Sequence, residues 1–267
     1  MDQIISEKRL EYRQRLGIEI NFSVENAYGL CIKVSSVNFK RLISNIINNS
    51  IEATSKNGII SVGIRVFEED FVDIIIQDNG KGIPTEMLEK LGQRGASFNK
   101  EGGSGLGLFH AKKSIESWGG KLLIQSALDR GTTITLRLPR EQQPRWLCSK
   151  LLVSEKAQIA ILDDDHSIHH TWNERFKHVL SVESVHFTSA DDFKKCKIEN
   201  MQYFLMDYEL IGSKETGLDL IEAFKLQDKS ILVTSYFEDE NILNRCQHLG
   251  VSIIPKALVG CVPIEVA

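Results

Sequence analysis

The stretch FVDIIIQDNGKGIP, residues 71–84, combines the two patterns on which the fold of the first half of the chain depends. Its first seven residues are mostly β-branched or aromatic, which predicts a buried strand. The strand ends at Asp78, and Gly80 and Gly82 follow directly. Glycine lets the backbone turn tightly and approach a ligand closely. We therefore expect a carboxylate at a strand end, beside a turn that can line a binding site.

A buried carboxylate at Asp78 could accept a hydrogen bond from the amino group of adenine. Guanine would present a carbonyl at the same place, and two acceptors left facing each other cost about 1–3 kcal/mol. An ordinary Asp-Gly turn on the surface explains the same residues without any ligand. The choice between the two depends on the neighbouring segments.

Two other segments of the first half carry residues that suit a nucleotide. Residues 36–58 predict a helix in which Asn45, Asn49 and Glu52 form a polar stripe opposite the apolar face. Amides on such a face can coordinate a hard cation, although a solvated helix face is the simpler interpretation. GGSGLGL at 102–108 precedes a predicted helix, and glycine amides at a helix N-terminus suit a phosphate.

The order of these motifs is more specific than any one of them. An asparagine-bearing helix, a strand with DxGxG, a polar stretch, GxGLGL before a helix and GTTITLRLP (131–139) follow one another along the chain. This series resembles the ATP-binding domain shared by histidine kinases, type II topoisomerases, Hsp90 and MutL. HAKKSIESWGGKLLIQS (110–126) and GTTITLRLP favour the histidine kinases. The resemblance covers about residues 18–140.

The resemblance implies ATP and Mg²⁺ as cofactors and assigns roles by position. The implied nucleotide-binding set is Asn45, Asn49, Asp78, Gly80, Gly82, Gly103, Gly105, Gly107 and Thr132. Asn49 would hold the magnesium ion, with Asn45 supporting the phosphate site. Asp78 would bind adenine, assisted by Thr132. The last three glycines of the set would lie at the phosphates, beneath a lid at residues 84–104.

A histidine kinase carries its phosphoacceptor histidine in a dimerising helical hairpin that precedes this domain. No histidine precedes His110 in this sequence, and residues 1–17 are predicted to form at most the tail of such a hairpin. We therefore expect the histidine to lie outside this sequence, in a parent chain or on another protein. The resemblance also implies a homodimer in the parent kinase.

The second half alternates strands with helices and contains ILDDDHSI at 161–168. This alternation predicts a doubly wound parallel sheet of five strands. Four predicted strands end in polar residues, at a sheet edge where open α/β folds place their sites: Asp163 with Asp164, Asp207, Thr234 and Lys256. The three aspartates could converge on Mg²⁺. Asp207 would be the phosphoacceptor nucleophile, Thr234 would hydrogen-bond the phosphoryl group and Lys256 would neutralise its charge.

This second arrangement resembles the receiver domain of two-component response regulators over residues 158–256. It differs from the usual pattern near Lys256. Ile253 stands where receivers usually carry an aromatic residue, and Pro255 precedes the lysine instead of following it. Eleven residues follow Lys256, so the final helix is expected to be missing or atypical.

His166, His169 and His170 follow the aspartate triplet. His166 and His170 are spaced one helical turn apart and could bind a transition metal. A polar helix start beside an acidic pocket is the simpler interpretation.

Charge and composition are consistent with these two sites. Residues 1–150 carry 21 Lys/Arg and 17 Asp/Glu, whereas the remainder carries 11 and 19, which suits an anionic ligand first and a cation second. There is no basic stripe that would suggest nucleic acid, and no apolar run approaches the roughly 18 residues of a membrane span. Five scattered cysteines without CxxC spacing argue against a disulfide framework. We expect a cytoplasmic protein, or the cytoplasmic part of a membrane-bound sensor.

The sequence thus predicts the C-terminal part of a bacterial hybrid sensor histidine kinase, a two-component signalling protein. Its expected segments are a helical lead-in (1–17), a histidine kinase/Hsp90-type ATP-binding α/β sandwich (18–140), a linker (141–157) and a flavodoxin-like receiver domain (158–267). The γ-phosphate would pass to the external histidine, and phosphorelay or regulation would involve Asp207. A response regulator or phosphotransfer protein is a further candidate partner.

Two alternatives remain open. The chain could be a non-catalytic ATP-binding regulatory module with a pseudo-receiver that docks a protein. It could also be an ATPase of the topoisomerase or MutL kind, although Asn45 stands where the resemblance implies a catalytic glutamate in those enzymes.

Overall fold

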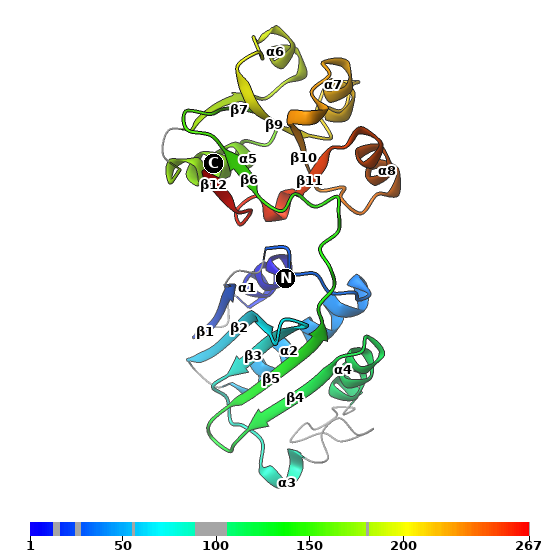
Figure 1. Ribbon diagram of the computed structural model, residues 1–267. Coiled ribbons are helices and arrows are strands. Elements are labelled where there is room, and N and C mark those ends of the chain that lie inside the picture. The colour runs from blue at the N-terminus through cyan, green and yellow to red at the C-terminus, as the bar shows by residue number, and fades with distance from the viewer. Residues whose placement is uncertain (13–16, 25–27, 55–56, 89–105, 180–181, 267) are drawn as a thin grey trace. The chain divides into compact units, whose positions relative to one another are not determined.

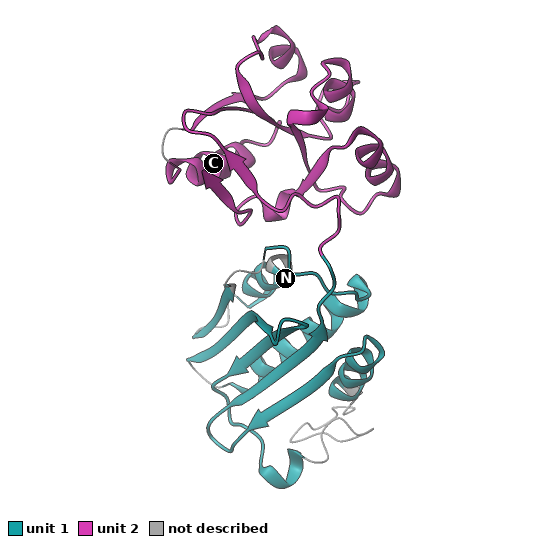
Figure 2. Cartoon of the chain, viewed as in Figure 1, with its two compact units in different colours: residues 1–142 teal, residues 143–267 magenta. Residues whose placement is uncertain are grey.

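The computed structural model describes residues 1–12, 17–24, 28–54, 57–88, 106–179 and 182–266. The chain divides into two compact units, residues 1–142 and 143–267 (Figure 2). Each unit has its own hydrophobic core. Most of the segment expected to be a linker, 141–157, therefore belongs to the second unit.

The first unit is built on one mixed five-stranded sheet with the order β1-β2-β3-β5-β4 (Figure 1). β1 runs parallel to β2, and the other neighbouring strands are antiparallel. Its elements are α1 (Asp2–Glu11), β1 (Ile18–Val24), α2 (Ser36–Ala53), β2 (Gly58–Phe67), β3 (Phe71–Asp78), α3 (Thr85–Leu88), α4 (Leu106–Ser117), β4 (Lys121–Ser126) and β5 (Thr132–Pro139).

Helices cover one face of this sheet because their apolar residues recur on one side. On α2 the buried positions are Leu42, Ile43, Ile46, Ile47, Ser50 and Ile51, which follow the helical repeat. Ile115 of α4 and Ile5 of α1 join them in the same core. Ser35 begins α2 as its N-cap, and its hydroxyl accepts a hydrogen bond from the Asn38 amide at 3.5 Å.

Residues 30–34 have the composition of a strand but do not form one. In residues 30–34, LCIKV, only Cys31 pairs with another strand-like residue, in an isolated antiparallel bridge to Glu141. The pairing is short because the chain enters the cap of α2 at Ser35, four residues later. The apolar pattern of LCIKV therefore reflects contact with the core, where Ile32 and Val34 pack.

The second unit contains a five-stranded sheet with the order β11-β10-β9-β7-β8, in which every pair of neighbours is parallel. Its elements are β6 (Leu151–Val153), β7 (Gln158–Leu162), α5 (His166–Lys177), β8 (Glu183–Phe187), α6 (Ala190–Lys195), β9 (Met201–Asp207), α7 (Gly217–Ala223), a 3₁₀ turn (Gln227–Lys229), β10 (Ser230–Thr234), α8 (Glu240–Leu249), β11 (Ser252–Pro255), a second 3₁₀ turn (Lys256–Leu258) and β12 (Ile264–Val266).

Different elements cover the two faces of this parallel sheet. Phe193 of α6, Leu220 of α7 and Ile242 of α8 share one core cluster with alternate strand residues. On α5, Trp172 and Phe176 are buried and stack with ring centroids 5.4 Å apart.

A short strand, β12, follows β11 at the place where a doubly wound unit would carry a helix. Within the described residues no helix follows the 3₁₀ turn at Lys256–Leu258, and β12 instead pairs in parallel with β6. Arg175 of α5 donates a hydrogen bond to the carbonyl of Val262, just before β12. The two-stranded β6·β12 sheet thus lies beside α5 (Figure 1).

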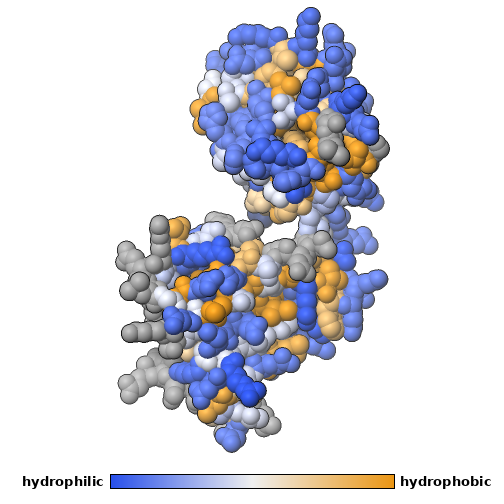
Figure 3. Space-filling model, turned by 90° about the vertical axis from the view of Figure 1, so that its left-hand side faces the viewer, coloured by the Kyte–Doolittle hydropathy of each residue, from blue (hydrophilic) through white to orange (hydrophobic). Residues whose placement is uncertain are grey.

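Hydrophilic residues make up most of the surface seen in Figure 3, with smaller hydrophobic patches on both units. Apolar side chains exposed singly, such as Ile211, are ordinary on globular proteins. Among the described helices, none combines the length and apolarity that a bilayer crossing requires.

Candidate functional site

Asp78 lies at the end of β3, and the structure buries it to 5% exposure. Its carboxylate accepts hydrogen bonds from the backbone amides of Gly80 (3.0 Å) and Thr132 (3.2 Å). Burial raises the pKa of Asp78, and hydrogen bonds from Gly80, the Ser50 side chain and Thr132 oppose that rise. A carboxylate held by backbone amides keeps a fixed direction, which a selective ligand contact requires.

Two glycines shape the turns around Asp78. Gly82 has φ +66°, and a Cβ added there would lie 1.9 Å from the carbonyl oxygen of Ala127. Gly131 has φ +83°, and its added Cβ would lie 1.9 Å from the carbonyl oxygen of Asp78. The backbone on both sides of the carboxylate therefore packs at a distance that only glycine allows.

The asparagines of the predicted stripe lie one turn apart on α2. Asn45 is exposed and Asn49 is half-buried. Asn49 is adjacent to Ser50, whose side chain hydrogen-bonds Asp78. The structure therefore brings Asn49 to the same end of the sheet as Asp78 and Thr132.

The predicted glycine loop is described only in part. Gly107 lies in the first turn of α4, and a Cβ added there would meet no atom of the described residues within 4 Å. Gly103 and Gly105 lie outside the described residues, as does most of the expected lid at 84–104.

Two serines complete this first site and were missed at the level of sequence. Ser50 hydrogen-bonds Asp78 through its side chain. The Ser126 hydroxyl lies 3.0 Å from the Thr132 hydroxyl, donates to the carbonyl of Gly131 (2.8 Å) and accepts from the amide of Ile83 (2.9 Å). Ser126 is the cross-strand partner of Thr132, so the register of the β4–β5 hairpin could have indicated it.

A second cluster lies at the C-terminal edge of the parallel sheet, where β7, β9 and β11 end. Asp163 and Asp207 are 1% and 4% exposed. The amino group of Lys256 donates to Asp207 (2.8 Å) and to Asp163 (3.0 Å). Residues 93 positions apart in the chain thus meet at one sheet edge, as the strand-end positions predict.

Burial and close contact shift the pKa values of the residues in this cluster. Burial raises the pKa of Asp207 to about 6, opposed by its hydrogen bond to Lys256. The pKa of Asp163 is raised for the same reason. Burial alone would lower the pKa of Lys256, but its hydrogen bonds to Asp207 and Asp163 outweigh that effect and raise it.

Asp164 completes an acidic group around this edge. Asp163, Asp164 and Asp207 each offer a carboxylate oxygen, and these oxygens lie within 4.8 Å of one another. Asp165 does not join them, because its carboxylate caps α5 by accepting from the amide of Ser167 at 2.8 Å. The aspartate run therefore divides between a cation-sized cluster and a helix cap.

Thr234 ends β10 and is fully buried. Its hydroxyl accepts a hydrogen bond from the amide of Tyr236 at 3.1 Å. The Tyr236 hydroxyl donates to Glu209 at 2.8 Å, and the Tyr236 and Tyr208 rings meet edge to face with centroids 6.1 Å apart. The sequence did not suggest Tyr236 and Glu209, because each lies in a loop two residues beyond the last residue of a strand, where no periodic pattern places a side chain.

The histidines after the aspartate run belong to the helix and its packing. His169 is buried on α5, with its Nε2 2.7 Å from the carbonyl oxygen of Asp163 and its Nδ1 2.7 Å from Nδ1 of His186. Among the described residues, no group of three metal-ligating side chains includes a histidine. The pairing of His169 supports the simpler interpretation, a polar helix start.

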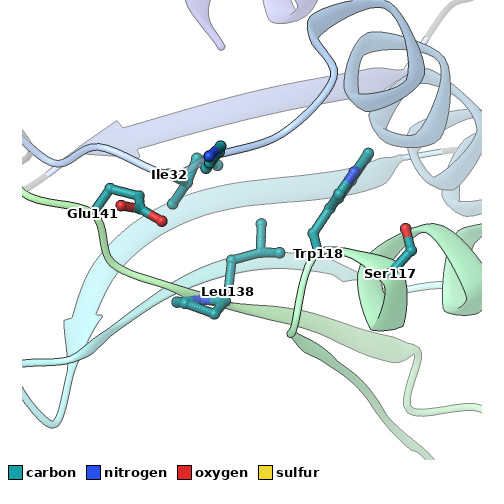
Figure 4. Close-up of a pocket in the computed structure, with 7 residues that line it drawn as sticks. Ile32, Ser117, Trp118, Leu138 and Glu141 are labelled. Carbon is teal, nitrogen blue, oxygen red and sulfur yellow. The ribbon is translucent and has the colours of Figure 1, made fainter.

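A pocket of about 290 Å³ opens elsewhere on the first unit (Figure 4). Its lining residues are Ile32, Lys33, Ser117, Trp118, Leu138, Pro139 and Glu141. Leu138 is six residues along β5 from Thr132, a distance of about 20 Å at the usual rise per strand residue. This pocket is therefore separate from the surroundings of Asp78.

Part of the first unit is similar to known proteins. Residues 35–142 match the family model described as "Histidine kinase-, DNA gyrase B-, and HSP90-like ATPase". A "Probable C4-dicarboxylate sensor kinase" of Halalkalibacterium halodurans is 36% identical over 104 residues, which are 38% of this chain and 20% of that protein. "Sensor histidine kinase WalK" of Bacillus subtilis is 34% identical over 125 residues, 44% of this chain and 20% of WalK. The chain thus spans about a fifth of the length of these curated relatives.

Solved structures also align with this chain. The "Mycobacterial sensor histidine kinase MprB" aligns with a TM-score of 0.45 at 24% identity and covers 53% of this chain and 97% of its own. Full-length ShkA in complex with AMPPNP aligns with a TM-score of 0.47 at 14% identity and covers 97% of this chain and 54% of its own.

Proposed function

We propose that this chain is the catalytic portion of a two-component histidine kinase, proceeding from the premise that its residues 35–142 are a histidine kinase-type ATPase domain. This domain would bind Mg-ATP and donate the γ-phosphate to a histidine that another domain presents. The buried carboxylate of Asp78, held between the Gly80 and Thr132 amides, carries the proposal.

The arrangement around Asp78 supports recognition of adenine. A buried acceptor selects a ligand that offers a hydrogen-bond donor, and adenine offers its amino group. Thr132 lies beside the carboxylate, and Gly82 with Gly131 keeps the surrounding backbone close. Asn49, near Asp78 on α2, would hold Mg²⁺, and Asn45 and Gly107 would lie toward the phosphates, together with Gly103 and Gly105.

Calorimetric titration with the non-hydrolysable analogue AMP-PNP tests this site. We expect magnesium-dependent binding that Asp78→Asn weakens about tenfold or more, because the substitution replaces an acceptor with a donor that faces the adenine amino group. Asp70→Asn, at an exposed carboxylate of the same unit, is the matched control and should bind as the native chain does. Equal affinity of the native chain and Asp78→Asn would contradict the role of Asp78.

We further propose that the second unit is a receiver domain phosphorylated at Asp207. When β7 to β11 are renumbered 1 to 5 along the chain, their order in the sheet is 2-1-3-4-5. Flavodoxin-like sheets have this order and bind ligands at the carboxyl ends of their strands. Support comes from the convergence of Asp163, Asp207 and Lys256 at that edge, with Thr234 at the end of the neighbouring strand. Asp207 would attack the phosphoryl group, while Lys256 and Thr234 would bind its oxygens.

The acidic cluster fits a magnesium ion. Magnesium in proteins prefers oxygen ligands and is held by one or two carboxylates with water and phosphate. Asp163, Asp164 and Asp207 offer three such oxygens, and burial raises the pKa of Asp163 and Asp207 even with Lys256 beside them. These three residues would hold Mg²⁺, whose charge would offset that of the transferred phosphoryl group.

Labelling with acetyl phosphate tests the second unit independently of ATP. We expect a phosphoryl mass adduct that requires Mg²⁺ and disappears in Asp207→Asn. Glu209→Gln changes a carboxylate two residues away and should still be labelled. An adduct that survives in Asp207→Asn would reject the assignment, and no adduct at all would favour a docking module without a phosphorylation cycle.

The final strand β12 gives that alternative its specific support. Within the described residues, β12 follows the 3₁₀ turn at the place where a doubly wound unit would carry a helix, and it pairs with β6. The partners of the proposed kinase are a histidine-bearing dimerisation domain, in the parent chain or in another, and a response regulator or phosphotransfer protein.

A further inference from the structure

The segment Trp146–Cys148 lies along the outer edge of β11, the last strand of the parallel sheet. The amide of Ile253 donates to the carbonyl of Trp146 at 2.7 Å, and the amide of Cys148 donates to the carbonyl of Ile253 at 2.9 Å. Leu147 and Ile253 form a parallel bridge. Leu147 and Cys148 are each 7% exposed, so this pairing is buried. The chain thus covers the edge of its own sheet.

The same segment contacts the loop that follows β10. The Trp146 ring lies 6.1 Å from that of Phe237, measured between centroids, and both pack on the core of this unit. Phe237 stands three residues after Thr234, and Ile253 stands three residues before Lys256. Trp146–Cys148 is therefore tied to both chain segments that carry the residues expected to close on a phosphoryl group.

We propose that Trp146–Cys148 senses the occupancy of Asp207, an inference that rests on the phosphorylation proposed above. The Thr234 hydroxyl accepts from the Tyr236 amide and has its own hydrogen to donate. A phosphoryl group on Asp207 attracts that hydrogen and draws Thr234 toward it. Residues 235–237 move with Thr234, and the Phe237 ring withdraws from Trp146.

Loss of this ring contact loosens the pairing with Ile253. Trp146 is four residues beyond the boundary between the two units, at residues 142 and 143. The looser pairing therefore frees the chain segment near residue 143, which joins the second unit to the first. In this way the second unit reports its state through the segment that joins it to the first unit.

Hydrogen–deuterium exchange on the full chain tests the proposal, with Mg²⁺ and beryllofluoride as the phosphoryl mimic. We expect the Cys148 amide to exchange about threefold or more faster with beryllofluoride, because local opening sets amide exchange rates. The amides of β6 serve as the internal reference and should keep their rates. A ¹⁹F signal from bound beryllofluoride, absent in Asp207→Asn, reports occupancy separately.

These two readouts separate the two proposals. Without a bound fluoride signal, the phosphorylation of Asp207 fails and the sensing role fails with it. With the signal present and the Cys148 exchange rate unchanged, the sensing role alone is wrong.

Substitutions of Trp146 refine the test. In Trp146→Ala we expect fast exchange at Cys148 already without beryllofluoride, no further response on its addition, and an intact fluoride signal. Trp146→Phe keeps an aromatic contact and should restore the response. Arg145→Ala, at the exposed neighbouring residue, should respond as the native chain does. A native response in Trp146→Ala would overturn the proposal.

Discussion

At the scale of single residues, burial and the closeness of the neighbouring backbone decide which substitutions the fold can accept. Gly82 and Gly107 illustrate the contrast within one predicted site. The first stands at a left-handed turn with no room for a methyl group, and the second stands in an open helical turn. The sequence pattern GxG cannot distinguish these situations, because the difference lies in what packs against each glycine.

The two glycines should therefore respond differently to alanine. Gly82→Ala is expected to lower the free energy of unfolding by more than about 1–2 kcal/mol, since alanine resists the left-handed region and its Cβ would collide with Ala127. Gly107→Ala should leave stability unchanged or raise it by up to about 1 kcal/mol, through helix propensity. Urea unfolding of both variants checks this. Equal effects would show that the turn at Gly82 relaxes.

Asp207 gives a prediction about pH. Its pKa in the folded protein is about 6, above the ordinary value of 3.8, so folding favours the protonated form. The stability this group contributes is fully present below pH 3.8 and is lost as the pH rises through about 6. At pH 7.5 without Mg²⁺, Asp207→Asn should therefore raise the free energy of unfolding, by roughly 1 kcal/mol.

The gain from Asp207→Asn should shrink as the pH is lowered to about 5, where the native carboxyl is largely protonated. Unfolding measured across this pH range checks the sign. Glu199→Gln, which alters an exposed carboxylate of the same unit, is the control and should show no such trend. A gain that is larger at low pH would contradict the raised pKa.

At the scale of elements, the open face of the first sheet holds an ion pair between the buried Asp73 of β3 and the partly exposed Arg137 of β5. Arg137 donates to both oxygens of Asp73, at 2.8 and 2.9 Å, and its guanidinium lies 3.1 Å from the centroid of the Phe67 ring. Asp73 is fully buried although its strand neighbours point to the helical side. The pair fixes the register of two central strands that lead to Asp78 and Thr132.

Removing one partner of this pair should be costly. Arg137→Met leaves a buried carboxylate without its bidentate partner, and we expect a clear loss in the free energy of unfolding. Arg65→Met removes a cation that is 62% exposed and 3.6 Å from Asp73, and it should cost less than about 1 kcal/mol. The double variant Asp73→Asn with Arg137→Met should recover part of the loss. Denaturant unfolding that ranks Arg65 above Arg137 would contradict this account.

Elements with long, regular patterns could be predicted from the sequence, whereas short ones could not. The periodic isoleucines of α2 and the strand ahead of Asp78 formed as expected. Residues 30–34 have a strand-like composition but pair at Cys31 alone, because pairing depends on a distant partner. β6 and β12, three residues each, carry too few positions to show any period, so nothing in the sequence predicted their pairing.

The residues of the two candidate sites also differ in how far the sequence could predict them. Parallel strands end at one edge, so strand-end residues such as Asp163 and Asp207 could be placed together without a structure. Ser50 was missed because its role depends on which side of α2 packs against Asp78. Ser126 was missed because its role depends on the register of the β4–β5 hairpin. Glu209 and Tyr236 were missed because they lie in loops, whose paths no periodicity describes.

At the scale of the whole molecule, two separate cores predict two separate responses to ligand. A ligand that binds only a folded unit stabilises that unit, by about 2.7 kcal/mol at a hundred times its dissociation constant. We expect calorimetry to resolve two unfolding transitions. AMP-PNP with Mg²⁺ should raise the midpoint of one, and beryllofluoride with Mg²⁺ should raise the other.

Asp78→Asn should abolish only the first shift and Asp207→Asn only the second. This pair of variants makes each ligand response its own control. A single transition raised by both ligands would show that the units unfold together.

The pairing of β6 with β12 also has a consequence for the order in which the second unit comes apart. Leu151–Val153 and Ile264–Val266 are distant along the chain, yet they pair in parallel, with Val153 opposite Val266. Each of these three-residue strands has the other as its partner in a two-stranded sheet. Displacement of either strand should therefore release the other, so the β6·β12 pair should exchange its amide hydrogens as one unit.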